Sequence, residues 1–121
     1  MPWQFTADKP IYSQLVELIS TGIINGGYPA GSRLPSVRDL AAEAKVNPNT
    51  MQRALTELEI KGLVYAERTS GRFVTENKAL IQTTKENLAL ARIERFFIDM
   101  ESLGISREQA LSLAADGKGL K

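Results

Sequence analysis

The stretch Leu34–Val74, LPSVRDLAAEAKVNPNTMQRALTELEIKGLVYAERTSGRFV, decides the fold of this chain. Apolar residues recur at three- and four-residue steps in two short segments, 36–44 and 47–61, as is typical of amphipathic helices. Two strand-like runs, 63–65 and 72–74, follow on either side of a Gly-containing turn and predict a hairpin. The order helix, turn, helix, hairpin predicts a mainly α fold with a small β-hairpin, a winged helix-turn-helix.

Capping residues mark where both helices begin and where the second ends. Ser36 is a preferred N-cap residue, and Asp39 three positions later completes an aspartate variant of the capping box. Asn47 is an equally good N-cap, and Pro48 follows at the first helical position, where its missing N–H costs nothing. Gly62 fits the left-handed position that ends a helix. The turn between the helices is therefore expected at residues 45–46.

Polar side chains cluster in the first turn and a half of the second helix, off its apolar stripe: Asn47, Asn49, Thr50, Gln52 and Arg53. In a helix-turn-helix, the N-terminal residues of the second helix contact base edges in the major groove. Asn and Gln match adenine, Arg matches guanine, and Thr serves a phosphate or a thymine methyl. The plainer alternative is that Asn47 only caps the helix and Gln52 is a solvated surface residue. The cluster as a whole favours DNA.

The hairpin has Thr69, Ser70 and Gly71 at its predicted tip, flanked by Arg68 and Arg72. Such a wing lies on the DNA backbone or inserts an Arg into the minor groove, where narrow A-tracts concentrate negative potential. The alternative is a plain hairpin that closes the core and carries two solvated arginines. Its place directly after the two helices favours the wing.

The residues around this core resemble the GntR family of bacterial transcription regulators, and within it the short YtrA-like branch. The matching residues are Pro10–Leu15, Pro29–Ala41, Val46–Thr50, Arg53–Leu55, Glu57–Glu59, Gly62-Leu63, Gly71 and Phe73-Val74. The resemblance covers Pro10–Val74 almost without gaps. It implies that Arg38, Asn49, Thr50, Arg53 and Gly71 touch DNA.

Two positions depart from the family pattern. Thr69 stands where the family usually has a first wing glycine, and Arg72 stands where a small residue is usual. They leave the wing conformation open and make Arg72 a candidate for an added phosphate contact. The full set of predicted DNA contacts is Arg33, Ser36, Arg38, Asn47, Asn49, Thr50, Gln52, Arg53, Arg68, Thr69, Ser70, Gly71 and Arg72.

Charge supports a nucleic-acid partner only locally, because the net charge of the 121 residues is +1. From Arg33 to Arg72 there are seven basic and five acidic residues. Folding must therefore polarise the surface if the protein is to bind DNA.

The segments before residue 34 are expected to support the helix-turn-helix. Pro10–Asn25 is a strong amphipathic helix that ends at Asn25-Gly26-Gly27, and it is expected to pack behind the two other helices. Met1–Lys9 is a short lead with Trp3 and Phe5. These aromatic residues either dock on the domain or a partner subunit, or belong to a frayed arm.

The predicted domain boundary lies between residues 75 and 76, giving a DNA-binding domain at 1–75 and a helical dimerisation region at 76–121. Lys78–Leu103 is the longest helical pattern, and Gly104 ends it; a last helix follows a capping box at Ser106–Gln109, and a polar tail runs from Asp116. A heptad-like seam with widening neighbours predicts a subunit interface. The expected interface residues are Leu88, Leu90, Ile93, Phe96, Phe97, Met100, Leu103 and Leu111. The resemblance implies a homodimer as well. The alternative is that these helices fold back on their own winged domain.

Several functions are excluded or disfavoured by composition. The chain has no histidine and no cysteine, so the usual nucleophile–base pairs and soft metal sites are absent. No segment matches the phosphate-binding pattern GxxxxGK[ST]. We expect no enzyme activity, cofactor or metal. The lack of cysteine, of a signal peptide and of a long apolar run predicts a cytoplasmic protein without membrane contact.

The sequence thus predicts a dimeric, sequence-specific DNA-binding transcription regulator, a repressor that binds an inverted-repeat operator. The alternative is a winged-helix module that binds protein through the second helix of the motif and does not bind DNA. A small-molecule effector has no dedicated domain; a cleft near Phe96, Phe97 and Met100 is the one place considered for it. The operator and the effector do not follow from the sequence.

Overall fold

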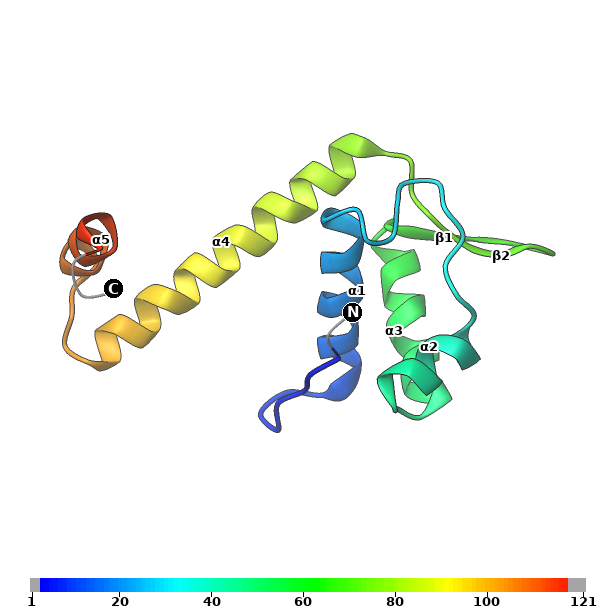
Figure 1. The fold of residues 1–121 in the computed structure, drawn as a ribbon, viewed down its shortest axis with the longest axis horizontal. Coiled ribbons are helices and arrows are strands. Elements are labelled where there is room, and N and C mark those ends of the chain that lie inside the picture. Colours follow the sequence, from blue (N-terminus) through cyan, green and yellow to red (C-terminus); the bar gives the residue numbers. More distant parts are fainter. Residues whose placement is uncertain (1–2, 118–121) are drawn as a thin grey trace. The chain divides into compact units, whose positions relative to one another are not determined.

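The computed structural model describes residues 3–117 and confirms the predicted fold class, with five helices and one hairpin in the expected order (Figure 1). Residues 1–2 of the N-terminal lead and residues 118–121 of the predicted tail lie outside the described part. The elements are α1 (Ile11–Ile24), α2 (Val37–Ala44), α3 (Pro48–Ile60), β1 (Val64–Glu67), β2 (Gly71–Val74), α4 (Lys78–Ser102) and α5 (Arg107–Asp116).

The chain divides into two compact units, residues 1–85 and 86–121. The first unit includes the beginning of α4, where Leu80 and Ile81 pack against the core formed by α1–α3 and the hairpin. The domain boundary predicted between residues 75 and 76 concerns which residues fold independently, and it stays a prediction.

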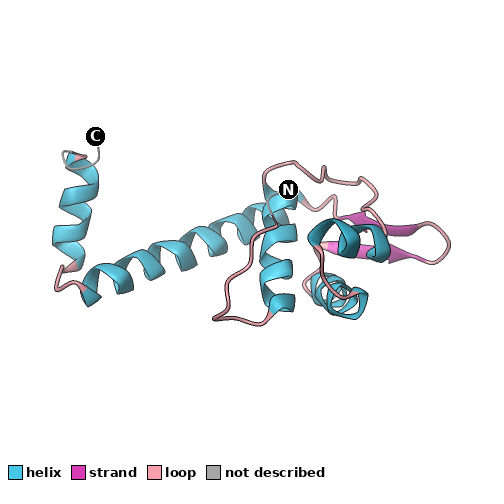
Figure 2. Cartoon of the chain, turned by 60° about the horizontal axis from the view of Figure 1, so that its bottom comes forward, coloured by secondary structure: helices cyan, strands magenta, loops and turns pink. Residues whose placement is uncertain are grey.

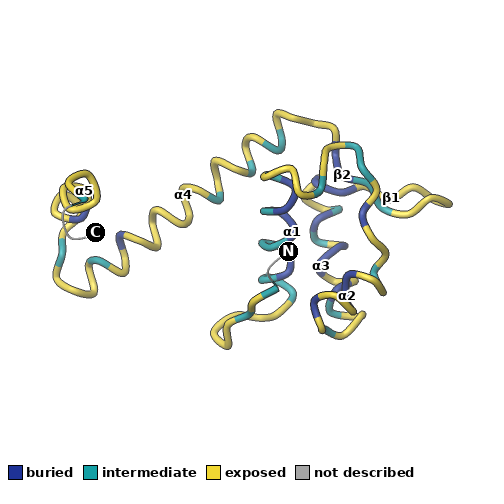
Figure 3. The backbone as a smooth tube through the Cα atoms, viewed as in Figure 1, coloured by how far each residue is buried: buried dark blue, intermediate teal, exposed yellow. Residues whose placement is uncertain are grey.

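The core of the first unit lies where α1, α2 and the hairpin meet α3 (Figure 3). The buried stripe of α3 is Met51, Ala54, Leu55 and Leu58, as its sequence pattern predicts. Small residues on α2 let that helix approach closely, because Ala41 and Ala44 are both buried. The core cluster as a whole consists of Leu15, Val16, Ile19, Ile23, Leu34, Leu40, Ala41, Ala44, Met51, Ala54, Leu55, Leu58, Leu63, Val64 and Val74.

Both helices of the helix-turn-helix end in the same C-terminal capping arrangement, a backbone hydrogen bond around a residue in the left-handed conformation. After α3, Leu63 N donates to Leu58 O at 3.1 Å around Gly62, whose φ is +79°. After α2, Val46 N donates to Ala41 O at 3.0 Å around Lys45, whose φ is +59°. Glycine adopts this left-handed conformation freely, whereas lysine does so at a cost. The turn before α3 therefore stores a small backbone strain.

The hairpin is a two-stranded antiparallel sheet (Figure 2). Val64 pairs with Val74 at its base, and Glu67 pairs with Gly71 next to the loop. The segment before α2 lies along β2: Leu34 N donates to Arg72 O, and Val74 N donates to Ser32 O, both at 2.8 Å. This pairing, which the sequence did not indicate, covers the outer edge of β2 and ties the hairpin to the start of α2.

The N-terminal lead docks on its own unit. Trp3 and Phe5 pack against the core, and Trp3 Nε1 donates a hydrogen bond to Glu43 Oε2 at 2.8 Å. The pKa of Tyr28 is raised above its usual value, mainly by burial and additionally by the negative charge of Glu43. The sequence left open whether these aromatic residues dock on the domain or a partner subunit, or belong to a frayed arm. In the structure they dock on the domain.

The second unit consists of most of α4 followed by α5. The capping box predicted at the start of α5 is present, with Ser106 Oγ accepting from Gln109 N at 3.2 Å and Gln109 Oε1 accepting from Ser106 N at 3.0 Å. Phe97 and Ala110 are the buried side chains of α4 and α5. Among residues 3–117, α4 included, no helix combines the length and the apolarity that crossing a membrane requires.

Candidate nucleic-acid interface

The side of α3 that faces away from the core is polar and exposed. Its members are Asn49, Gln52, Arg53 and Thr56, which we call the α3 outer face. Gln52 and Arg53 come three and four residues after Asn49, and Thr56 comes three residues after Arg53, so the four share one side of the helix. That side is opposite the buried stripe that begins at Met51, and burial of the stripe orients all four outward. Thr50 is half-buried at the edge of this face. The helix position and its exposed polar side are those of a recognition helix.

Two predicted contact residues have a structural role as helix caps. Asn47 Oδ1 accepts a hydrogen bond from Asn49 N at 2.7 Å, and Ser36 Oγ accepts one from Asp39 N at 3.1 Å. The cap uses the amide oxygen of Asn47 but leaves its two N–H donors for another acceptor. The sequence predicted that Asn47 caps the helix, and it does. It left open whether capping is the only role of Asn47, and base contact by its amide group remains a prediction.

The two long side chains of the α3 outer face are held to different degrees. Gln52 Nε2 donates to Thr56 Oγ1 at 3.4 Å, which is a long and therefore weak hydrogen bond. The guanidinium carbon of Arg53 lies 3.7 Å from the centroid of the Tyr12 ring on α1. Gln52 is thus loosely restrained, whereas Arg53 is stacked on a neighbouring helix.

Arg33 and Gly71 are brought together at the base of the hairpin tip. Gly71 has φ +104°, and a Cβ atom added to it would lie 3.0 Å from Arg33 Nε. A side chain at this position would therefore be strained by its backbone and crowded by the arginine. The loop between the strands consists of Arg68, Thr69 and Ser70, all exposed.

Arg72 is engaged inside the fold. Its Nε lies 2.5 Å from Glu59 Oε1 of α3, and the two side chains are only 20% and 31% exposed. The pair braces β2 against the second half of α3. The sequence did not indicate this bond, because it depends on a hairpin register that turns Arg72 toward the helix.

Among residues 3–117, four arginines of the predicted contact set carry guanidinium groups without an ion-pair partner. In the described part of the chain, the exposed side chains of Arg33, Arg38, Arg53 and Arg68 have no carboxylate partner within ion-pair distance. Two nearby carboxylates are occupied: that of Glu43 by Trp3 and that of Glu59 by Arg72. A chain with a net charge of only +1 therefore keeps four uncompensated guanidinium groups on the unit that carries α3.

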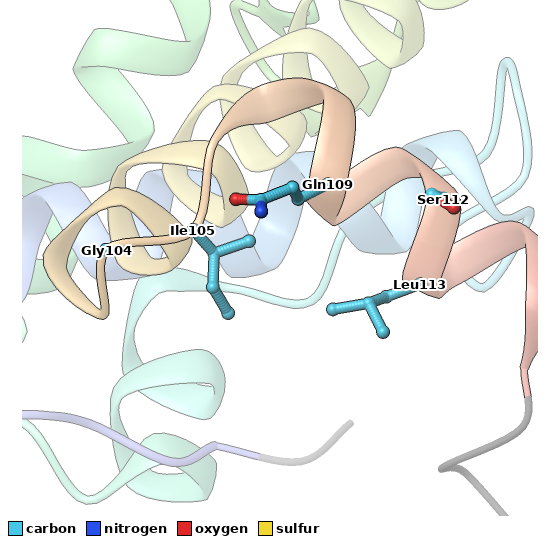
Figure 4. Close-up of a pocket in the computed structure, with 5 residues that line it drawn as sticks. All are labelled: Gly104, Ile105, Gln109, Ser112 and Leu113. Carbon is cyan, nitrogen blue, oxygen red and sulfur yellow. The ribbon is translucent and has the colours of Figure 1, made fainter.

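One pocket of about 390 Å³ lies in the second unit, at the turn between α4 and α5 (Figure 4). It is lined by Gly104, Ile105, Gln109, Ser112 and Leu113, so it is not the cleft considered near Phe96, Phe97 and Met100. Gln109 is already used in the α5 capping box. Within residues 3–117, no three His, Cys, Asp or Glu residues gather where they would hold a metal ion.

Residues 11–74 match the family model described as bacterial regulatory proteins, gntR family. The chain is similar to the HTH-type transcriptional repressor YtrA of Bacillus subtilis, with 32% identity over 95% of this chain and 92% of YtrA. Its structure is similar to a GntR family transcriptional regulator from Listeria monocytogenes, with a TM-score of 0.82, 40% identity and coverage of 93% and 98%. It also matches AraR(DBD) in complex with operator ORX1, with a TM-score of 0.55, 27% identity and coverage of 60% and 93%.

Proposed function

Because this chain belongs to the gntR family of bacterial regulatory proteins and is a DNA-binding transcription regulator rather than an enzyme, we propose that it acts as a repressor that binds an inverted-repeat operator as a homodimer. The repressor role is supported by similarity to YtrA, which is named a transcriptional repressor. Similarity to AraR(DBD), crystallised with an operator, supports the use of the helix-turn-helix unit for operator contact.

The observation that carries the proposal is the chemistry of the α3 outer face. Asn49 and Gln52 have the amide groups that form paired hydrogen bonds with adenine in the major groove. A face that bound protein would instead be expected to offer aromatic or other apolar anchors at its centre. We therefore favour operator recognition over the protein-interaction module as the role of this face.

We assign the remaining predicted contacts according to their surroundings. Arg33, Arg38 and Arg68 are exposed and keep their donors for phosphate oxygens. Thr69 and Ser70 follow Arg68 on the hairpin loop and are proposed to contact the same backbone. We propose that four further residues contact the DNA backbone or the edges of bases: Ser36, Asn47, Thr50 and Gly71. Arg72 is proposed to act by bracing the hairpin through Glu59, so that the wing is presented at a fixed angle.

The proposed homodimer is supported by the second unit, which exposes large apolar side chains along α4 and α5. Those exposed are Leu90, Ile93, Phe96, Ile98, Leu103, Leu111 and Leu113. Large apolar side chains left uncovered on helices are expected to pack against a partner. Five of these residues belong to the interface expected from the sequence, and Ile98 and Leu113 are exposed in addition to them. Of the other expected members, Leu88 and Met100 are half-buried and Phe97 is buried within the unit.

Two-fold symmetry connects the homodimer to the form of the operator. A two-fold dimer presents its recognition helices about 34 Å apart, one turn of DNA, or at a multiple of that spacing. Each half-site alone supplies few phosphate contacts and is bound weakly at physiological salt. We therefore propose that both halves of an inverted repeat are needed for occupancy.

Footprinting on the DNA upstream of the protein's own coding region tests this function. We expect protection of an inverted repeat by the wild type, and loss of protection by Asn49→Ala/Gln52→Ala at the same protein concentration. Gln82→Ala, at an exposed position on α4 away from the α3 outer face, is the matched control and should protect normally. Protection by the Asn49→Ala/Gln52→Ala variant equal to that by wild type would contradict the assignment of α3. A protected segment without internal symmetry would contradict the homodimer.

A further inference from the structure

Tyr12 is placed against a predicted DNA contact although no sequence motif assigns it a role in DNA contact. It lies in the first turn of α1, and its ring stacks on the guanidinium of Arg53, whose carbon is 3.7 Å from the ring centroid. Tyr12 is half-buried and Arg53 is exposed. The ring therefore covers one face of the guanidinium and leaves the N–H donors around its edge accessible.

Other stacked or paired arginines of this protein differ in one respect. Arg107 also lies over an aromatic ring, that of Phe97 at 4.6 Å, but its Nη2 is 2.6 Å from Glu94 Oε1. Arg72 is likewise paired, with Glu59. Within the described residues, Arg53 makes the ring contact with Tyr12 and neither a hydrogen bond nor an ion pair. A stacked guanidinium with unused donors is suited to bind an external anion.

The neighbours of Gln52 and Arg53 define where each lies on the α3 outer face. Glu59 follows Gln52 by about two helical turns, so both lie on the side of α3 that faces the hairpin, where Arg72 binds Glu59. Arg53 lies about 100° further round the helix from Gln52, on the side that faces α1, where Tyr12 holds it. Arg53 is therefore at the α1 edge of the α3 outer face, and Asn49 and Gln52 are at its middle and opposite side.

We propose that Tyr12 is a positioning residue that holds the Arg53 guanidinium to bind a backbone phosphate at the edge of the major groove, so that Arg53 fixes register while Asn49 and Gln52 contact bases. This rests on the proposed function of α3 as a recognition helix. The stacked ring already restricts the Arg53 side chain in the free protein, so Arg53 loses less conformational entropy when it binds DNA. The planar guanidinium can then donate two parallel hydrogen bonds to one phosphate.

The salt dependence of binding separates a phosphate contact from a base contact. Removing one phosphate contact lowers the slope of log K against log salt concentration by about 0.9 and weakens binding to all sequences alike. We expect this of Arg53→Ala, measured by fluorescence anisotropy on the footprinted operator and on an unrelated duplex of equal length. An unchanged slope together with relaxed preference at one base pair would overturn the assignment.

A double-mutant cycle tests the part played by Tyr12. Tyr12→Leu retains apolar volume without the ring face, and we expect it to weaken binding to both duplexes by about two- to five-fold, the range of an exposed cation–π contact. Tyr12→Phe keeps the ring and should bind as the wild type does. In the Arg53→Ala background, Tyr12→Leu should have no further effect, because the group that it positions is gone.

Equal losses from Tyr12→Leu in the wild-type and Arg53→Ala backgrounds would show a structural role and overturn the proposal. Circular dichroism checks that each variant folds; if Tyr12→Leu does not, Tyr12→Met takes its place in the same cycle. Failure of the proposed function has a different signature. It would appear as equal affinity of the wild type for the upstream DNA and the unrelated duplex, and the salt slope of Arg53→Ala would still be measurable on both.

Discussion

The two units of this chain use apolar residues in opposite ways. The 13-residue α3 buries a stripe of four side chains and turns its polar residues outward. The 25-residue α4 buries only Phe97 among its described side chains and exposes several large apolar ones, with Leu90 64% and Ile98 50% exposed. A helix with an uncovered apolar side is stable only against a partner. The first unit is therefore complete as a single chain, and we propose that the second becomes complete in the homodimer.

Removal of core volume from the first unit is the largest effect that this comparison predicts. Leu58 is fully buried, so Leu58→Ala should lower the free energy of unfolding by about 2–5 kcal/mol through lost burial and a residual cavity. Urea unfolding of the first unit, followed by circular dichroism, measures this loss. The matched control is Leu90→Ala, which removes the same atoms from an exposed position and should change the stability of the first unit little. Equal losses in the two variants would contradict the distinction between the units.

A charge on the apolar side of α4 should have its effect on association instead. Ile93 is 49% exposed, and in the proposed homodimer Ile93→Lys would place an unpaired ammonium at the interface. We expect the dimer dissociation constant to rise about 30-fold or more, the loss of ~2 kcal/mol or more typical of a central interface residue. Sedimentation equilibrium over a range of protein concentrations measures it, with Gln82→Lys as control. Unchanged association of Ile93→Lys would mean that α4 is not the interface.

A substitution at Gly71 tests whether crowding at the hairpin affects the stability of the first unit. Gly71→Ala would force an L side chain to φ +104° and bring its Cβ to 3.0 Å from Arg33 Nε, so a loss of about 1–2 kcal/mol in stability is expected. Gly26→Ala isolates the backbone part of this cost, because Gly26 has φ +83° and open space around its added Cβ. If the two thermal unfolding midpoints fell equally, crowding by Arg33 would have no part in the effect.

The smallest effect expected is a gain in stability. Lys45 occupies the left-handed position that glycine occupies after α3, so Lys45→Gly should stabilise the first unit by about 1 kcal/mol. Gly62→Ala is the matched opposite change and should destabilise by a similar amount, since φ is +79° and the nearest atom to the added Cβ, Leu80 Cδ2, is at 3.4 Å. Thermal unfolding of both variants gives the two signs; a loss of stability in Lys45→Gly would show that the lysine side chain contributes more than its strain costs.

Most of the fold could be predicted from local features of the sequence. The caps at Ser36, Asn47 and Ser106 depend on short-range hydrogen bonds, and each side chain accepts a backbone N–H of the following helix as the sequence predicts. The capping box is complete at Ser106, whereas at Ser36 the described structure has the bond from Asp39 N but not the predicted return bond from Ser36 N to the Asp39 side chain. The helix-turn-helix and hairpin follow from periodicity and from glycine positions in the same way. The resemblance to the GntR family was confirmed by the family model over residues 11–74.

Contacts between distant segments were not predictable from the sequence. The Arg72–Glu59 pair depends on the hairpin register, and the stacking of Arg53 on Tyr12 depends on how α1 crosses α3. The pairing of residues 32–34 with β2 arises in the same way. The sequence therefore predicted which side chains face outward, but not which of them the fold holds in place. For Arg72 that difference changes the proposed role from a phosphate contact to a brace.

The most direct test of the account is the number of chains bound to one operator duplex, measured by native mass spectrometry on the footprinted inverted repeat and on a duplex carrying one half-site. We predict two chains on the inverted repeat, bound together without an intermediate of one chain at physiological salt, and much weaker binding to the half-site. A single chain bound with full affinity to the half-site would contradict it.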